Sequence, residues 1–382
     1  MFASSPLLHL IVVSLLAHMA LAGSRIITSL YALSLHASEL TIGILIALFS
    51  LCPMLFAMSV GRLIDRIGII RPMLAGCMAI GIGCILPGLI GGMPVLYLAT
   101  MLIGTGFMAV QIVSQHTVGA ISTEEKRATN YSWLALGFSI SGFFGPVIAG
   151  LLIEHATYST AYMAFAGLPL CALVFIAFSQ LKKIRLHAQP ADAHSSALGL
   201  LRDVRIRRIY MVGILLASAW DLFTFVLPIH GTRSGFSAST IGLILGCFSA
   251  ATFLVRLLMP WYARRYSEWQ VLTSALVLAA LCYVLFPLIH APLPLMALAA
   301  MLGLAVGAGQ PNILALLHLM APAGRAAEAV GIRVTIGNAC QVFLPLAFGG
   351  AGAALGLSAV FWGMGVMISA GVPMAWRQSI GK

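Results

Sequence analysis

The chain has 382 residues, of which 61% are hydrophobic and 8% are charged. Ordinary globular domains carry roughly 25% charged residues, so a soluble protein of this length could not cover its surface with so few charges. The formal net charge of +11 by itself suggests a protein that binds nucleic acid. The positions of the cations along the chain decide whether this interpretation holds. The composition predicts an all-α polytopic membrane protein.

A bilayer core about 30 Å thick is crossed by about 20 apolar residues of helix. Polar and Pro/Gly clusters cut the chain into twelve such stretches: residues 7–33, 41–60, 72–90, 94–119, 130–153, 160–180, 208–230, 239–262, 270–289, 294–319, 329–351 and 355–376. The most polar interruption lies between the sixth and seventh stretches. We therefore expect an N-terminal six-helix bundle (1–180), a cytoplasmic linker (181–207) and a C-terminal six-helix bundle (208–382).

Within the first stretch, residues 7–22 end in a sequence similar to a signal-peptide cleavage site, Ala20-Leu21-Ala22. No cation precedes this run, and apolar residues continue past the site as far as Leu33. We therefore expect the stretch to remain as a transmembrane helix.

Polar side chains follow one face of this first helix. Four of them recur at helical spacing: Ser14, His18, Arg25 and Ser29. At 100° per residue they lie within about 60° of arc. A charge at the centre of a membrane helix costs at least about 2.5 kcal/mol, so Arg25 needs an explanation. The stripe either contacts a substrate or forms a buried polar seam that joins the helix to its neighbours.

The loop expected after the second helix contains a motif. It reads Gly61-Arg-Leu-Ile-Asp65-Arg66-Ile-Gly68-Ile-Ile-Arg71. This resembles the signature loop of the major facilitator superfamily, Gly-x-x-x-Asp-Arg-x-Gly followed by basic residues. Its glycines permit a tight turn, and in the family the loop braces the two halves in the outward-facing state. Ile69 replaces the usual basic residue, so the resemblance assigns that contact to Arg71.

Hydrogen-bonding side chains also occur in the fourth and tenth helices. Gln111 and Gln115 share one face of helix 4, where they either bind substrate or join helices. Gln310 and Asn312 flank a proline in helix 10 and point to different faces. We therefore expect at most one of this second pair to line a transport path.

The fifth helix carries a second motif, Gly145-Pro146-Val-Ile-Ala149-Gly150. It resembles the Gly-Pro-x-x-Gly-Gly element of proton-coupled exporters in the same superfamily, with Ala149 in place of one glycine. Small residues let helices approach closely, and proline frees a carbonyl and bends the helix.

An internal repeat relates the two halves at a shift of 199 positions. The residues Ser38, Thr41-Ile42-Gly43 and Phe49-Ser50 recur as Ser237, Thr240-Ile241-Gly242 and Phe248-Ser249. The same shift maps Gly104 onto Gly303 and Pro146 onto Pro345. The repeat predicts two pseudo-symmetric six-helix bundles, the construction typical of alternating access and, by the resemblance, the fold of the superfamily.

The cations predict the orientation. Of the 21 Lys and Arg residues, all but Arg25, Arg233 and Arg256 lie at the C-terminus or around the loops after helices 2, 4, 6, 8 and 10. The positive-inside rule makes this face, and with it both termini, cytoplasmic. Anionic lipid and insertion account for the +11, so we expect a multi-pass protein of the plasma or inner membrane without a nucleic-acid partner.

One acid lies near the middle of an expected helix, Asp221 in helix 7. The repeat places Arg25 at the position of Thr224, one turn from Asp221, so the two charges occupy comparable depths. Family members line a central cavity with helices 1, 4, 7 and 10, and the resemblance implies that both charges face it. Burial favours a protonated carboxyl and a nearby cation favours an ionised one, so Asp221 is a candidate proton carrier; a permanent structural ion pair is the alternative.

These features favour a secondary active transporter for a small organic solute, coupled to protons, with export favoured over uptake by the helix-5 resemblance. A solute or copper importer of the same fold stays open, with soft ligands in helices 2 and 3: Cys52, Met54, Met58, Cys77 and Cys84. A membrane-embedded enzyme or a non-transporting sensor is the alternative from another class, but the sequence has no HExxH or GxSxG motif. We expect no enzyme activity, no cofactor, no metal and a monomer.

Overall fold

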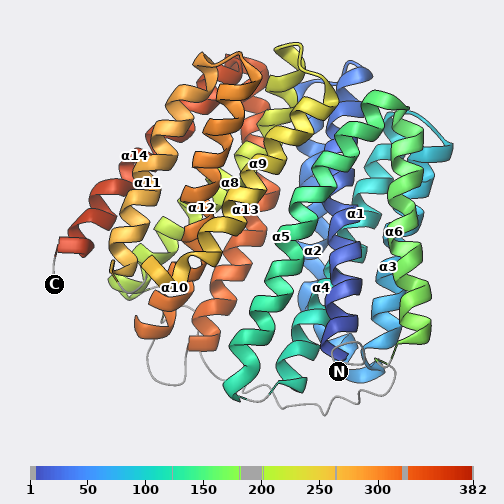
Figure 1. Cartoon of the computed structure of the whole chain (residues 1–382), viewed down its shortest axis with the longest axis horizontal. Coiled ribbons are helices and arrows are strands. Elements are labelled where there is room, and N and C mark those ends of the chain that lie inside the picture. Colours follow the sequence, from blue (N-terminus) through green and yellow to red (C-terminus); the bar gives the residue numbers. More distant parts are fainter. Residues whose placement is uncertain are drawn as a thin grey trace. The chain divides into compact units, whose positions relative to one another are not determined.

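The computed structural model describes residues 6–122, 124–179, 181, 200, 202–262, 265–320 and 326–380 (Figure 1). Twelve helices in these ranges are long and apolar enough to cross a membrane. The prediction of an all-α protein with twelve membrane helices is confirmed.

Contacts between Cα atoms divide the chain into two compact units, called unit 1 and unit 2 below. Unit 1 comprises Met1–Pro190 and Gly235–Gly246, and unit 2 comprises Ala191–Ser234 and Cys247–Lys382. The short stretch Gly235–Gly246 was expected in the C-terminal bundle, but its contacts group it with unit 1. Most of the expected linker lies outside the described residues.

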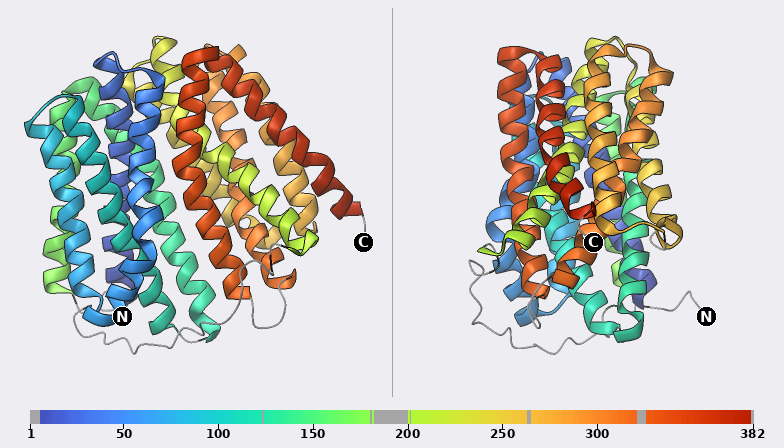
Figure 2. Two further views of the ribbon diagram at one scale, coloured as in Figure 1. Left: turned by 180° about the vertical axis from the view of Figure 1, so that it is seen from behind. Right: turned by 90° about the vertical axis from the view of Figure 1, so that its left-hand side faces the viewer.

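The helices before the linker are α1 (Pro6–Ser34), α2 (Glu39–Ile67), α3 (Ile70–Leu89), α4 (Met93–Ile121), α5 (Glu124–His155) and α6 (Tyr158–Phe178). Those after it are α8 (Val204–Arg233), α9 (Ala238–Leu257), α10 (Met259–Tyr262), α11 (Glu268–Leu285), the 3-10 turn η2 (Phe286–Leu288), α12 (Pro292–Met320), α13 (Ala326–Leu355) and α14 (Leu357–Ile380). Long neighbouring helices run side by side within each unit (Figure 2).

Hydroxyl side chains begin several of these helices. Ser38 accepts a hydrogen bond from the amide of Thr41 at 3.2 Å, and Thr157 caps α6 in the same way. Ser267 and Gln270 form a reciprocal capping box at the start of α11. Each cap satisfies an amide that has no acceptor within its own helix.

The expected eighth helix, 239–262, is wrong as a single element. The structure ends α9 at Leu257 and starts the short helix α10 at Met259. Pro260 has no backbone N–H to bond to residue 256, so a continuous helix would lose a hydrogen bond there. Apolarity alone does not reveal the break.

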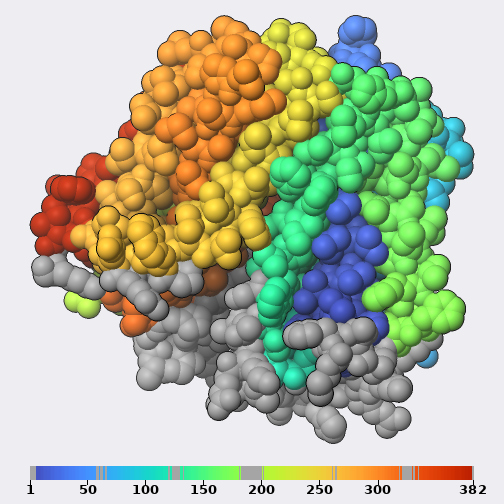
Figure 3. Space-filling view, in the orientation of Figure 1, coloured from blue at the N-terminus to red at the C-terminus, as the bar shows by residue number. Residues whose placement is uncertain are grey.

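Helix α1 is the central packing element of the unit 1 helices. It packs against α4, α5 and α6, while α3 packs on α4 and α6 and α2 packs on α4. The beginning of α1 lies at the surface between α5 and α6 (Figure 3). In unit 2, α8 packs against α12, α13 and α14, and α11 packs between α12 and α14.

The repeat is visible as two equivalent helix crossings. A methyl group added at Gly104 of α4 would overlap the backbone carbonyl of Phe49 in α2. One added at Gly303 of α12 would overlap the carbonyl of Phe248 in α9. Both pairs are related by the shift of 199, so the same backbone contact occurs once in each unit. This confirms the expected pseudo-symmetry at the level of packing.

Substitution at either crossing should destabilise the protein. We expect Gly104→Ala and Gly303→Ala each to cost about 1–3 kcal/mol, because a backbone must move to admit the methyl group. Thermal unfolding of the purified protein in detergent measures the effect.

Matched controls exist in both units. Gly167 in α6 and Gly363 in α14 have no atom within 4 Å of an added methyl group, so their alanine variants should unfold near the wild-type temperature. Equal losses at crossing and control positions would contradict the account.

Candidate functional site

The polar stripe of α1 begins in a buried contact with α4. The hydroxyl of Ser14 donates to that of Ser114 at 2.7 Å, and Ser114 donates to the carbonyl of Val110. Both serines are almost fully buried. These contacts are those of a polar seam that joins two helices.

One turn further, His18 sits in an aromatic pocket. Its Nδ1 shares a hydrogen bond of 2.5 Å with the hydroxyl of Ser141 in α5. The imidazole packs against Phe107 and Phe138, with ring centroids 5.3 and 5.0 Å away. An imidazole held by one hydroxyl and two rings has a fixed orientation, which suits either a structural or a ligand-contacting group.

A second polar row on α1 was missed by the sequence analysis. The hydroxyl of Ser24 lies 3.4 Å from the sulfur of Cys84 in α3. The hydroxyl of Thr28 lies 2.7 Å from that of Tyr162 in α6. Together with the Ser14 and His18 contacts, these bonds join α1 to four other helices of its unit.

Arg25 is half-buried on α1. Its guanidinium carbon lies 6.0 Å from the ring centroid of Phe49 in α2, within the range of a cation–π contact. Ser29 is buried and donates to the carbonyl of Arg25 at 3.0 Å. Of the four predicted stripe residues, Arg25 therefore presents the charge, while the Ser29 hydroxyl is used within its own helix.

The two glutamines of α4 differ in exposure. Gln111 is half-buried and Gln115 is exposed. The backbone carbonyl of Gln115 accepts a hydrogen bond from the phenol of Tyr131 in α5 at 2.9 Å. Their predicted roles as substrate contacts stay predictions.

In unit 2, Asp221 lies in the interior of α8 and is only 7% exposed. Thr224 donates to the carbonyl of Asp221 at 3.0 Å, so its hydroxyl is used within the helix. The phenol of Tyr283 in α11 donates to the carbonyl of Ala219 at 2.5 Å. Tyr283 and Cys340 lie within electrostatic reach of the Asp221 carboxylate.

Among the twelve candidate spans, the acids other than Asp221 lie at span ends: Glu39, Glu154 and Glu268. Of the acids in these spans, Asp221 is the one that lies at a depth where hydrocarbon surrounds the protein. Such a position is costly unless the group is functional or satisfied within the bundle.

The predicted pair on α12 has two different surroundings. Gln310 is exposed, and its Oε1 accepts a hydrogen bond from Arg256 of α9 at 3.3 Å. Asn312 is buried and donates to the carbonyl of Ala308 at 2.8 Å. Arg256 therefore contacts a neighbouring helix, a partner that the sequence analysis did not identify.

The signature motif is helical for most of its length, which corrects the expected loop. Gly61, Asp65 and Arg66 belong to the last two turns of α2, and their side chains lie outside the described part. The turn is made at Gly68, whose φ of 78° is left-handed, and its amide donates to the carbonyl of Ile64. Arg71 is exposed in the first turn of α3. Hydropathy marks only the part of a helix inside hydrocarbon, so it missed this extension.

The helix-5 element brings two helices close to α5. A methyl group added at Gly145 would lie 3.0 Å from the Cβ of Ala22 in α1. One added at Gly150 would overlap the carbonyl of Ala238, and Gly242 packs in the same way on the carbonyl of Pro146. All these residues belong to unit 1. The small residues therefore allow close approach on two faces, as their type predicts.

An acid at the end of α5 continues this contact. The Oε2 of Glu154 accepts a hydrogen bond from the amide of Ser239 at 2.9 Å, and Ser237 caps the amide of Thr240. A carboxylate at a helix N-terminus satisfies an orphan amide and interacts favourably with the helix dipole.

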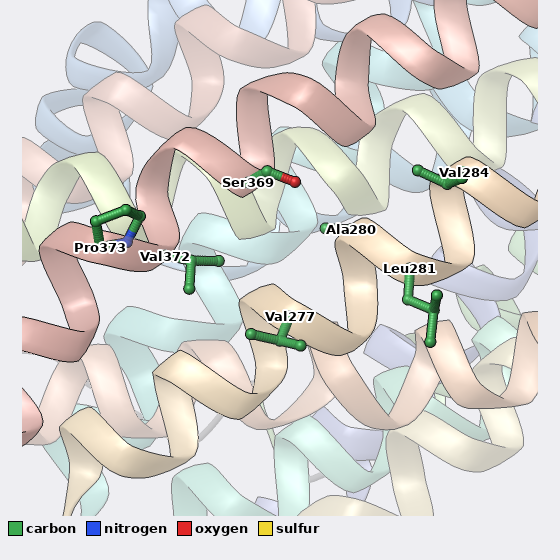
Figure 4. Close-up of a pocket in the computed structure, with 7 residues that line it drawn as sticks. All are labelled: Val277, Ala280, Leu281, Val284, Ser369, Val372 and Pro373. Atoms are coloured by element: carbon green, nitrogen blue, oxygen red, sulfur yellow. The ribbon is translucent and has the colours of Figure 1, made fainter.

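A cavity of about 440 Å³ lies between α11 and α14 (Figure 4). It is lined by Val277, Ala280, Leu281, Val284, Ser369, Val372 and Pro373. The hydroxyl of Ser369 already donates to the carbonyl of Gly365. With no charged group in its wall, this cavity lacks the chemistry of the predicted site.

Removing the Glu154 carboxylate should expose the start of α9. The Ser239 amide has no acceptor within its own helix, so its protection from exchange depends on Glu154. We expect Glu154→Ala to speed hydrogen–deuterium exchange at residues 238–241, whereas His155→Ala, at the adjacent exposed position, should leave it unchanged. Unaltered exchange in Glu154→Ala would contradict the capping role.

Comparison with known proteins agrees with this geometry. The sequence matches the family described as Major Facilitator Superfamily over residues 10–294 and 234–378. It is 24% identical to the class B tetracycline resistance protein of Escherichia coli over 224 residues, which cover 54% of this chain and 55% of that protein. It is 24% identical to the class D tetracycline resistance protein of Salmonella ordonez over 324 residues, 80% of this chain and 78% of that protein.

The fold is also found among solved structures. A POT family transporter in complex with 5-aminolevulinic acid superposes with a TM-score of 0.82 at 14% identity, over 99% of this chain and 96% of that one. This likeness concerns the fold alone. The family and the fold indicate a transporter and not a membrane-embedded enzyme. On the family match, the repeat and the twelve helices together, the chain belongs to the major facilitator superfamily.

Proposed function

We propose that this protein is a proton-coupled secondary transporter that exports a small organic solute by alternating access. The observation that carries the proposal is the buried carboxyl of Asp221 in the interior of α8. The likeness to two tetracycline resistance proteins supports export, and so does the resemblance of the helix-5 element to that of exporters.

A buried carboxyl suits proton coupling because alternating access changes its surroundings. In a closed, apolar environment the protonated form is favoured, and in contact with water the ionised form is favoured. A conformational cycle that exposes Asp221 to one side and then the other would thus carry one proton per turn.

One proton is energetically sufficient for this work. An elementary charge moving inward through about 100 mV releases about 2.3 kcal/mol. This corresponds to roughly a fifty-fold gradient of an uncharged solute. The remaining elements of the proposal are cytoplasmic termini, a plasma or inner membrane location and a monomer.

Arg25 is the proposed contact for an anionic or carboxylate-bearing group of the solute. It is the charge of the α1 stripe, half-buried and within cation–π range of Phe49. The neighbouring His18 ring, fixed by Ser141, supplies a further polar edge. Arginine matches the two oxygens of a carboxylate with paired N–H donors.

The transport assays first require a solute that binds the protein. A thermal-shift panel of tetracycline, amphiphilic cationic drugs and small carboxylates on the purified protein gives the probe for the transport assays. Compounds that raise the unfolding temperature are then loaded into proteoliposomes.

Asp221→Asn separates proton coupling from binding. With the probe in proteoliposomes under an imposed pH gradient, uphill transport should fall at least about tenfold because asparagine carries no proton. Counterflow exchange should stay within about twofold of wild type. Asp221→Glu should retain part of the uphill activity, and Glu268→Gln, at a span end, should match wild type. Wild-type uphill transport by Asp221→Asn would refute the coupling role.

Arg25→Ala tests the substrate contact. For a carboxylate probe, we expect the dissociation constant to rise about tenfold or more, the cost of a lost charge-assisted hydrogen bond. The dissociation constant of Arg25→Lys should lie between those of wild type and Arg25→Ala. Arg377→Ala, which removes an exposed cation of α14, should bind the probe as tightly as wild type. Equal affinity in Arg25→Ala and wild type would assign Arg25 to packing alone.

A further inference from the structure

Four polar side chains of unit 2 gather at the ends of α9 and α10 and on α12. Arg256 lies in the last turn of α9, Tyr262 ends α10, and Gln310 and Asn312 belong to α12 (Figure 1). Arg256 donates to Gln310 at 3.3 Å. The hydroxyl of Tyr262 is buried near Arg256 and Asn312 and has no hydrogen-bond partner among the described residues. We call these four residues the α9–α12 cluster.

The cluster has an excess of donors. A guanidinium carries five N–H groups, and among the described residues Arg256 donates a hydrogen bond to the neutral amide of Gln310. Within the described part of the chain, no carboxylate forms an ion pair with Arg256. Burial raises the pKa of Tyr262, so its hydroxyl keeps the proton that it can donate. Unused donors on a cation and a phenol are the complement of an oxyanion.

The fold does not require this cluster. At the shift of 199, the first half of the chain has Ala57, Leu63 and Val113 where the second half has Arg256, Tyr262 and Asn312. Gln310 alone has a polar counterpart, Gln111. The first bundle therefore builds the equivalent helices with apolar residues at these positions, so the cluster is an addition specific to the second half.

The surface beside the cluster is typical of a membrane interface. Leu257 and Trp261 are 64% and 62% exposed. The guanidinium carbon of Arg265 lies 5.6 Å from the Trp261 ring. Exposed leucine, tryptophan and arginine together mark the level of lipid headgroups, on the face that the positive-inside rule predicts to be cytoplasmic.

We propose that the α9–α12 cluster binds the phosphate of an anionic phospholipid of the cytoplasmic leaflet. Arg256 and the Tyr262 hydroxyl donate to the phosphate oxygens, and Gln310 holds the guanidinium in place. The acyl chains lie along the exposed apolar surface around Leu257. This site goes beyond the proposed transport function and does not depend on it.

The test measures the lipid-dependent gain in stability of the full-length protein. Purified wild type in neutral detergent is titrated with phosphatidylglycerol, with phosphatidylcholine, and with inorganic phosphate alone, while thermal unfolding is followed. The variants are Arg256→Gln and Tyr262→Phe. Arg265→Gln is the matched control, because it removes a cation from the same face outside the cluster.

Phosphatidylglycerol should raise the unfolding temperature of wild type more than phosphatidylcholine does. The lipid fraction giving half the effect should rise about tenfold in Arg256→Gln and severalfold in Tyr262→Phe, and stay within twofold in Arg265→Gln. Native mass spectrometry should count at least one fewer retained phosphatidylglycerol in Arg256→Gln, a readout independent of the variant's own stability.

Three results would overturn the proposal. The first is the same phosphatidylglycerol dependence in Arg256→Gln and wild type. The second is an equal loss in Arg265→Gln, which would indicate a diffuse surface charge. The third is an Arg256-dependent shift with inorganic phosphate alone and none with the lipid, which would assign the cluster to a soluble anion.

Discussion

Lipid hydrocarbon offers no hydrogen-bonding partner, so each polar group of a membrane helix must be satisfied by the protein around it. Helix α1 shows how far this constraint organises unit 1. Its Ser14, His18, Ser24 and Thr28 bond to side chains of α4, α5, α3 and α6, respectively. Helix α1 is thereby fixed on several sides. Arg25, on the same helix, is held in a defined place, as a binding residue requires.

The lipid environment has a second consequence, which is the close approach of helix backbones. Helices in lipid associate through packing and not through exclusion of water. The crossings at Gly104 and Gly303 bring one backbone against another in each unit, and the helix-5 element does the same toward α1 and the start of α9. The halves agree in these crossings and differ in their charges. Asp221 corresponds to Ala22, Arg25 to Thr224 and Arg256 to Ala57. The three charged residues for which we propose a role in transport or binding therefore lie at positions where the two halves of the repeat differ.

The helices could be predicted from the sequence because hydropathy reports burial in hydrocarbon directly. The same signal stops at the edge of the bilayer, so it missed the last turns of α2 and the break before α10. It identified Ser14 and His18 as polar but not their partners, since no local pattern pairs residues a hundred positions apart, such as Ser14 with Ser114 or His18 with Ser141. Glu154 was likewise invisible as a cap, because the amide that it bonds belongs to another helix.

The proposed transport cycle requires Asp221 to exchange a proton as the solute binds and leaves. Proton release on binding tests it most directly: the solute found in the panel is mixed with lightly buffered, purified protein, and a pH indicator records the change. At a pH below the pKa of Asp221 in the solute-free protein and above its pKa in the solute-bound protein, we expect a release approaching one proton per wild-type molecule, and none from Asp221→Asn with its binding site saturated. Equal release from the two proteins would contradict it.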